Sequence, residues 1–287
     1  MIGNDQLARL VANEADMAYK RRIMLFLRWL DPEPQDQVLD GACGRGFTLN
    51  FVRAVSDCAL VGLDLEYQCV RLAHEQLSGR AIHLLNGDLC CLPFADHSFD
   101  KVILAEVLEH LVDDRSGLAE AVRVTRPGGL IAISVPNANY PFWWDPINRT
   151  LGVLLGTHVA RGSLAGIWAN HVRLYTFDDL LALVGGAGLQ VEAVRMLIHY
   201  CFPFSHNLVY GLGKPLLQAG RLPAPMARAA SRYRLDGRAG SRLNPVNMGL
   251  WLFNLVDRLN DRLDEEEHEI SAMNICLKVR VPGGEVR

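Results

Sequence analysis

The stretch QVLDGACGRG, residues 37–46, decides the fold. QVLD has the apolar centre of a short strand, and the six residues that follow are mostly small. Small residues let the backbone approach a ligand closely, and a helix beginning near Phe47 would point free N–H groups and its positive dipole end at that ligand. The stretch therefore predicts a strand, a ligand-binding loop and a helix, in that order.

Short apolar strands recur along the chain, and helical patterns separate them. The expected strands are residues 37–40, 59–64, 81–86, 101–106, 129–135, 189–197 and 273–281, with helices at 68–77, 117–124 and 176–187 among those between them. This alternation is typical of a parallel sheet covered on both faces by right-handed crossovers. The sequence predicts an α/β fold with a doubly wound, mostly parallel, seven-stranded sheet.

The other segments divide the chain into four expected parts. Residues 1–35 form an N-terminal helical cap, with one helical pattern from 5 to 30. The core spans 36–197 and carries an aromatic lid at 136–175, which lacks strand periodicity. A helical insertion occupies 198–271, and 272–287 supply the last core strand and a tail.

Composition indicates a globular protein. Hydrophobic residues make up 50% and charged residues 21% of the chain, and the net charge of −3 gives no overall attraction to nucleic acid. The N-terminus lacks a secretory pattern, no apolar run reaches spanning length, and the seven cysteines include no C-x-x-C pair. We expect a cytoplasmic protein whose thiols are not catalytic.

The insertion has its own composition. From 198 to 262 it holds nine basic and three acidic residues, a formal balance of +6, interleaved with aromatics and an apolar row from Leu252 to Leu263. Such a segment could rest on an anionic membrane surface, which would make the protein membrane-peripheral. The favoured alternative is a helical subdomain that packs its apolar side on the core.

Acidic residues end three successive strands at intervals of twenty-four residues. They are Asp40, Asp64 and Asp88. Asp64 could accept hydrogen bonds from both ribose hydroxyls, and Asp88 could accept one from an adenine amine. A compact adenosyl ligand suits this set better than a dinucleotide, because the glycines do not form G-x-G-x-x-G as in dehydrogenases.

A series of motifs now points to one family. VLDGACGRG, GLDLE, GDLCCLPFADHSFD, VILAEVLEHL and RVTRPGGLIAISVPN, within residues 36–197, resemble the successive motifs of Rossmann-like class I S-adenosylmethionine-dependent methyltransferases. The resemblance is strongest to the type-11-like group related to ubiquinone and menaquinone methyltransferases. It implies S-adenosyl-L-methionine as cofactor and S-adenosyl-L-homocysteine as product.

The resemblance also implies a cofactor site. Asp40, Gly44 and Gly46 would surround the methionine part, Asp64 would bind the ribose, and Asp88 with Leu89 would frame the adenine. Ala42 replaces the first glycine of the family's G-x-G-x-G, and a glycine stands instead at 41. The expected cofactor-binding residues are Asp40, Gly41, Ala42, Gly44, Gly46, Asp64, Leu65, Asp88, Leu89 and Glu106.

Catalysis is expected from the residues after the fourth strand. Methyl transfer is an in-line displacement that needs a base only when the acceptor carries a proton. His110 and His171 are the expected catalytic residues, and Glu106 would bind the cofactor's amino group. With Glu109, these residues form an ExxEH…H set that resembles a metal site of small-RNA and ubiquinone O-methyltransferases. A structural role is favoured, and no metal ligands are predicted.

The lid indicates the acceptor. Its aromatic residues predict an apolar wall against a small hydrophobic molecule such as an isoprenoid quinone, a polyketide or a lipid-linked sugar, and O-methylation is favoured; they are Tyr140, Phe142, Trp143, Trp144 and Trp168. RNA is the alternative acceptor, although no RNA-binding module is recognisable. A cofactor-binding scaffold or sensor without catalysis is the alternative from another class. The sequence sets no oligomeric state.

Overall fold

The computed structural model describes residues 2–14, 16–162, 164–202, 223, 232–235, 243–262 and 271–283. Its centre is a seven-stranded sheet in the order β3-β2-β1-β4-β5-β7-β6. β1 to β5 are mutually parallel, and β7 is antiparallel to both β5 and β6. The strands are β1 (Gln37–Asp40), β2 (Ala59–Asp64), β3 (Ile82–Asn86), β4 (Phe99–Ala105), β5 (Thr125–Pro136), β6 (Gln190–Leu197) and β7 (Asn274–Arg280). The predicted α/β fold and strand number are confirmed.

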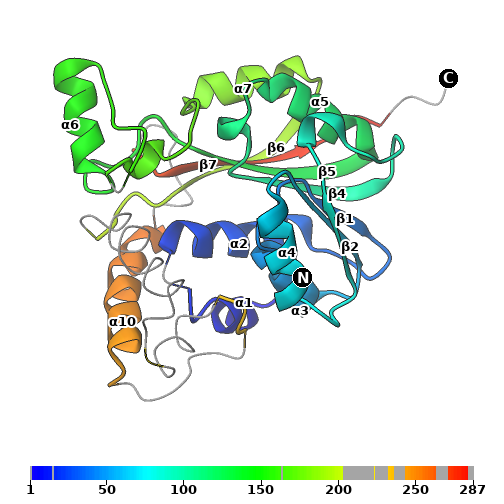
Figure 1. Cartoon of the computed structure of the whole chain (residues 1–287), viewed down its shortest axis with the longest axis horizontal. Coiled ribbons are helices and arrows are strands. Elements are labelled where there is room, and N and C mark those ends of the chain that lie inside the picture. The colour runs from blue at the N-terminus through cyan, green and yellow to red at the C-terminus, as the bar shows by residue number, and fades with distance from the viewer. Residues whose placement is uncertain are drawn as a thin grey trace.

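Helices cover both faces of the sheet (Figure 1). On one face lie α2 (Met17–Leu30), α3 (Phe47–Val55) and α4 (Tyr67–Gln76), and on the other α5 (Asp114–Val124) and α7 (Phe177–Gly186). The strand pattern explains the two layers, because successive side chains point to opposite faces. Val38 joins one buried cluster and Leu39 the other.

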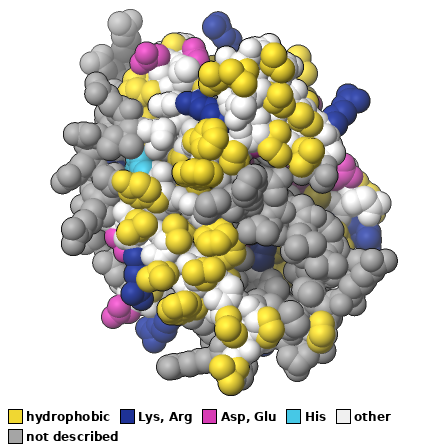
Figure 2. Space-filling view, turned by 90° about the vertical axis from the view of Figure 1, so that its left-hand side faces the viewer, with side chains coloured by type: hydrophobic (Ala, Val, Ile, Leu, Met, Phe, Trp, Pro, Cys, Tyr) yellow, Lys and Arg dark blue, Asp and Glu magenta, His cyan; other side chains and the backbone are white. Residues whose placement is uncertain are grey.

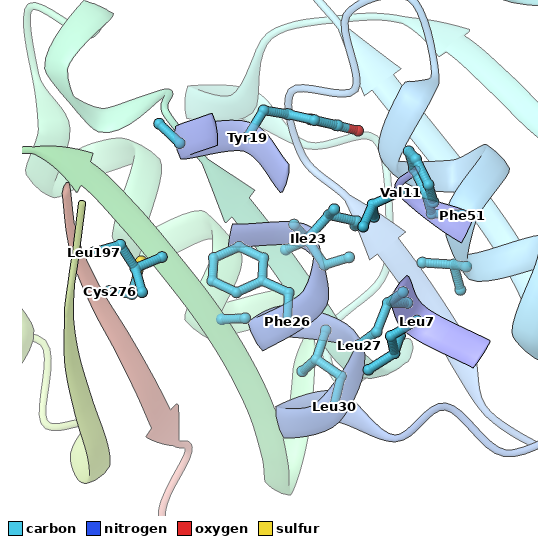
Figure 3. Packing of buried hydrophobic residues seen from close by; sticks show 14 of the residues in the cluster. Leu7, Val11, Tyr19, Ile23, Phe26, Leu27, Leu30, Phe51, Leu197 and Cys276 are labelled. Atoms are coloured by element: carbon cyan, nitrogen blue, oxygen red, sulfur yellow. The ribbon is translucent and has the colours of Figure 1, made fainter. Parts of the chain in front are cut away.

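The N-terminal segment differs from the prediction of one helical pattern over 5–30. It forms two helices, α1 (Asn4–Leu10) and α2. The chain restarts at Asp16, whose side chain caps α2 by accepting hydrogen bonds from the backbone N–H groups of Ala18 and Tyr19. Hydrophobic side chains of both helices, including Leu7, Ile23 and Phe26, pack into the cluster under the sheet (Figure 3). The cap is thus part of the core packing.

The chain leaves the sheet at the start of the lid and returns to it at a neighbouring position. Asn137 and Tyr175 form an isolated parallel bridge, so the two ends of the lid lie side by side. Between them the chain forms α6 (Pro146–Leu155) and the short 3-10 helix η3 (Gly166–Trp168). In the insertion, the described residues include α10 (Pro245–Asp257) and the 3-10 helix η5 (Arg258–Arg262). Residues 203–222, 224–231, 236–242 and 263–270 of the predicted insertion, which include Phe204, Tyr210 and Leu263, lie outside the described residues.

Candidate cofactor and acceptor site

The loop between β1 and α3 holds two glycines in the left-handed region. Gly44 has a φ of 53° and Gly46 a φ of 76°. A Cβ on Gly46 would lie 2.5 Å from Cδ1 of Leu77 and 3.3 Å from Cβ of Ala73 on α4, so a side chain there would press on the end of α4 as well as strain the backbone. A Cβ on Gly44 would meet nothing within 4 Å. Gly46 therefore shapes the loop, and Gly44 leaves open space beside its backbone.

Asp64, at the end of β2, faces this loop. Its carboxylate accepts hydrogen bonds from the backbone N–H groups of Gly44, at 2.7 Å, and Glu66, at 2.9 Å. These two donors fix the orientation of the carboxylate and leave lone pairs for a further donor. Asp64, which the sequence predicts to bind the ribose, is therefore a rigidly held hydrogen-bond acceptor beside the open space at Gly44.

Asp40, at the end of β1, is almost completely buried. The pKa of its carboxyl is raised to about 7, mainly by burial and also by the charge of Asp64, while the N–H of Ala42 and the charge of Arg22 act in the opposite direction. Its Oδ1 has no hydrogen-bond partner within the described part of the chain. Such an oxygen is suited to accept a hydrogen bond from a cationic ligand group.

The predicted adenine residues follow β3. Oδ1 of Asp88 accepts a hydrogen bond from the N–H of Cys90 at 2.8 Å and caps the 3-10 helix η1 (Leu89–Cys91). Leu89 is buried, and its Cδ1 would lie 3.1 Å from a Cβ on Gly41, so it packs closely against the glycine loop. Leu65, after β2, is exposed. The structure thus places all three residues around the carboxyl edge of the sheet.

Glu106 begins the turn after β4 in a left-handed conformation with a φ of 53°. Its Oε1 lies 3.3 Å from a guanidinium nitrogen of Arg22 on α2, and its Oε2 accepts a hydrogen bond from Nδ2 of Asn274 on β7 at 2.9 Å. A non-glycine residue at positive φ is strained, and such strain is common at functional sites. The sequence predicted Glu106 but neither of its partners.

Glu109, His110 and His171 form a compact cluster on the acceptor side. One ligand-type atom from each lies within 4.8 Å of the others. Nε2 of His110 is 3.7 Å and Nε2 of His171 is 3.9 Å from Oε1 of Glu109, and the two ring centroids are 4.7 Å apart. The fold therefore brings His171, from the lid, to the pair that follows β4.

The surroundings of Glu109 in this cluster affect the protonation of its carboxyl group. Glu109 is fully buried, and neither carboxylate oxygen has a hydrogen-bond partner among the described residues. Burial and the charge of Glu106 raise the pKa of Glu109 well above its ordinary value, although Arg22 acts in the opposite direction. Nδ1 of His110 lies 2.9 Å from the carbonyl oxygen of Asn170 and donates to it in the matching tautomer, which leaves Nε2 as an acceptor.

Part of the insertion reaches the glycine loop, and the sequence analysis missed this contact. The hydroxyl of Tyr233 donates a hydrogen bond to the carbonyl oxygen of Arg45 at 2.9 Å, and its ring lies 4.7 Å from that of Phe47. The guanidinium of Arg232 lies over the rings of Phe47 and Tyr19. Residues 232–235 thus cover the start of α3. No local pattern signals this contact, because it joins segments almost 190 positions apart.

The lid aromatics separate into two groups. Tyr140 and Trp144 are buried in the main hydrophobic cluster, and Trp168 packs against it and stacks on His158 at 3.8 Å. Phe142 and Trp143 are exposed. The five side chains therefore do not form one wall: three pack the lid down, and two face solvent.

Comparisons with known proteins point to methyltransferases. Residues 39–133 match the family described as "Methyltransferase domain". A demethylmenaquinone methyltransferase of Corynebacterium urealyticum is 40% identical over 107 residues, 37% of this chain and 44% of that protein. A ubiquinone/menaquinone biosynthesis C-methyltransferase of Geobacter sulfurreducens is 28% identical over 205 residues, 67% of this chain and 78% of that protein. Other relatives are named as O-methyltransferases.

The same fold occurs in a solved structure of the [4+2]-cyclase SpnF, with a TM-score of 0.53 and 15% identity over 92% of this chain and 82% of that one. The chain spans less than half the length of several curated relatives that it matches. The family match, the relatives and the fold agree with the motifs of class I S-adenosylmethionine-dependent methyltransferases that the sequence shows. S-adenosyl-L-methionine is the cofactor of this class.

Proposed function

We propose that this chain transfers a methyl group from S-adenosyl-L-methionine to a small, hydrophobic acceptor. The observation that carries the proposal is the meeting of two groups of residues at the carboxyl edge of the parallel strands. Gly44, Asp64 and Asp40 lie on one side, Glu109 and its histidines lie on the other, and Arg22 influences both. Ligands of doubly wound sheets bind at this edge.

On the cofactor side, each residue has a distinct role. Asp64 binds the ribose hydroxyls, and the open space at Gly44 admits the methionine chain. The unpartnered oxygen of Asp40 accepts from the cationic part of the cofactor, whose charge would also ionise that carboxyl. Glu106 holds Arg22 in place, and its carboxylate would bind both that guanidinium and the cofactor's amino group.

On the acceptor side, His110 removes the proton of a hydroxyl acceptor. Its Nε2 is an acceptor in the tautomer that Asn170 favours, and a carboxylate at Glu109 would stabilise the imidazolium formed. His171, carried by the lid, closes the other side of Glu109 and excludes water. A base in this position favours oxygen as the methylated atom. Quinone-related names among the relatives favour a hydrophobic acceptor over RNA.

A second candidate is methyl transfer assisted by a divalent cation. The observation that favours it is Glu109, a fully buried carboxyl group without hydrogen-bond partners among the described residues, beside two imidazole nitrogens. Two neutral imidazoles and a carboxylate form a common set of metal ligands, and the His110–Asn170 hydrogen bond orients one of them. The cation would lower the pKa of an acceptor hydroxyl.

Calorimetric titration with S-adenosyl-L-homocysteine tests the proposal, with the full chain, Asp64→Asn and the control Asp57→Asn. The side chain of Asp57 is 95% exposed and precedes β2, whereas Asp64 is at the other end of that strand. We expect micromolar binding to wild type and control, no binding of NAD(H), and a loss of about tenfold or more for Asp64→Asn. No binding to wild type would refute the cofactor site, and equal binding to Asp64→Asn would refute the ribose assignment.

A measurement of catalytic turnover distinguishes an enzyme from a cofactor-binding scaffold without catalysis. We expect transfer of a labelled methyl group to components of a lipid extract or to hydroxylated quinone analogues. Binding of S-adenosyl-L-homocysteine without transfer to any extract would favour the scaffold. Dialysis against chelator, followed by titration with Mg²⁺ or Zn²⁺, tests the cation: uptake of one ion that His171→Ala abolishes would favour metal assistance over His110 alone.

A further inference from the structure

Helix α10 buries polar side chains and leaves several large apolar side chains exposed. Asn247, Leu250 and Asp257 are buried, and Nζ of Lys20 on α2 donates to Oδ1 of Asn254 at 2.6 Å and to Oδ2 of Asp257 at 2.7 Å. The large exposed side chains recur at helical spacing on the other side; they are Met248, Trp251, Leu252, Leu255 and Leu259. A helix whose outer side faces water normally carries polar residues on that side and apolar residues toward the core. This outer face is built for contact with an apolar environment.

Helix α6 repeats this arrangement. Nδ2 of Asn148 is buried and donates to the carbonyl oxygen of Ala165 at 3.0 Å, and its Oδ1 accepts from the N–H of Val159 at 2.7 Å. Val153, Leu154 and Leu155 are 70–77% exposed at the other end of the helix. Three adjacent exposed aliphatic residues are costly in water, since each loses the stabilisation that burial would give.

Both helices lie on the same side of the molecule, α6 at one end and α10 at the other (Figure 1). Figure 2 looks onto this side and shows hydrophobic side chains gathered over it in both regions. Phe142 and Trp143, the lid aromatics that face solvent, precede α6. We name the outer residues of α6 and α10, together with these two aromatics, the apolar face.

The charges on this side favour one kind of occupant. Residues 146–177 contain no Asp or Glu, and 243–256 contain no charged residue of either sign. Arg161 and Arg258, each next to one of the helices in sequence, are exposed, and no acid among the described residues pairs with either. The nearby acids are already paired: the buried Asp257 with Lys20 and Arg21, and the exposed Asp261 with Arg21. Exposed tryptophan and leucine beside these two arginines suit the interface of an anionic bilayer.

We propose that the apolar face docks this protein on the surface of an anionic lipid bilayer. Leu154, Trp251 and Leu255 would enter the boundary between headgroups and acyl chains, and the two arginines would contact lipid phosphates. None of the described helices has both the length and the apolarity to span a bilayer, so the docking is peripheral. The proposal goes beyond methyl transfer and does not depend on it, because it rests on residues outside the cofactor and acceptor site.

Vesicle flotation of the full chain tests the proposal without any assay of activity. The probes are vesicles of phosphatidylcholine alone and of phosphatidylcholine with phosphatidylglycerol. The variants are Leu154→Glu on α6 and Leu255→Glu on α10, and the control is Val191→Glu, which alters another exposed apolar residue on the edge strand β6. Thermal unfolding of each variant shows that it is folded.

We expect wild type and control to float with the anionic vesicles, less so in high salt, and each α6 or α10 variant to lose about tenfold or more in partitioning. Absence of flotation, or loss confined to one of the two helices, would overturn the proposal. So would a concentration-dependent dimer that Leu255→Glu dissociates while vesicle binding is absent, because a second copy would then cover the face.

Discussion

A guanidinium nitrogen of Arg22 lies 3.3 Å from Oε1 of Glu106, and this contact joins the N-terminal helix α2 to the turn after β4. The charge of Arg22 also opposes the rise in the pKa of both Asp40 and Glu109. One cation of α2 therefore influences three carboxyl groups of the candidate site. Helix α2 is part of the site's electrostatics as well as of its packing.

Removing that cation should weaken cofactor binding. In Arg22→Gln, the pKa of Asp40 rises further, so a smaller fraction of Asp40 is ionised at neutral pH. We expect the affinity for S-adenosyl-L-methionine to fall by about tenfold and its pH midpoint to move upward, measured by titration from pH 6 to 9. Arg9→Gln, on the exposed surface of α1, is the control. An unchanged midpoint would contradict the role of Arg22.

Asp40→Asn should stabilise the fold while impairing function. A carboxyl whose pKa is raised from 3.8 to about 7 contributes stability that is fully present below pH 3.8 and is lost as the pH rises through 7. Asparagine does not ionise, so Asp40→Asn does not lose this stability at high pH. Its free energy of unfolding should exceed that of wild type at pH 8, by at most about 4 kcal/mol, but not at pH 4. Chemical denaturation at the two pH values measures the difference. A variant less stable than wild type at pH 8 would show that Asp40 is held charged.

Two glycines of one loop should respond differently to alanine. Gly46→Ala should lower the free energy of unfolding by ~1–3 kcal/mol, because the new Cβ would clash with Leu77 as well as strain the backbone. Gly44→Ala meets no neighbour and should cost about 1 kcal/mol, yet its methyl group would project into the space proposed for the cofactor. Denaturation and S-adenosyl-L-homocysteine titration of both variants check the contrast. Normal cofactor affinity in Gly44→Ala would move the cofactor away from this space.

The two histidines should separate chemistry from binding. His110→Gln should slow turnover by about 10²- to 10⁴-fold if it removes the acceptor proton, and should leave the affinity for S-adenosyl-L-homocysteine unchanged. His171→Gln should raise KM and lower kcat less, because this residue closes the lid over Glu109. Steady-state kinetics with titration of each variant provide the measurement. Equal turnover in His110→Gln and wild type would exclude it as the base.

The sequence predicted β1, β2 and β3 well because each combines an apolar run with an acidic or amide residue at its carboxyl end. Asp40, Asp64 and Asn86 end β1, β2 and β3 as expected. The residues after those ends lie along one edge of the sheet, as expected, since parallel strands bring their carboxyl ends together; their role in binding the cofactor stays a prediction. His171 was identified from a resemblance, and the fold places it beside Glu109.

Long-range partners could not be predicted in the same way. Arg22 lies in a helix whose pattern indicates only amphipathicity, and Asn274 is a buried polar residue in an apolar strand; neither position signals that it meets Glu106. Helix α10 was expected to pack its apolar side on the core, as the favoured reading of the insertion. The structure bears this out only in part. Leu250 is buried and Phe253 packs on the main hydrophobic cluster, but Leu252, Leu255 and Leu259 of the predicted apolar row are exposed, and Lys20 on α2 binds polar groups of α10.

The Asn137–Tyr175 bridge has an evolutionary consequence. It joins the two ends of a long excursion, with the N–H of Ala138 donating to the carbonyl oxygen of Tyr175 at 2.8 Å. Because these ends are held together, the exposed part of the excursion can change in length while the strands keep their register, whereas Tyr140 and Trp144 are constrained by their packing in the main hydrophobic cluster. We therefore expect sequence variation among related chains to concentrate on the outer residues of the lid.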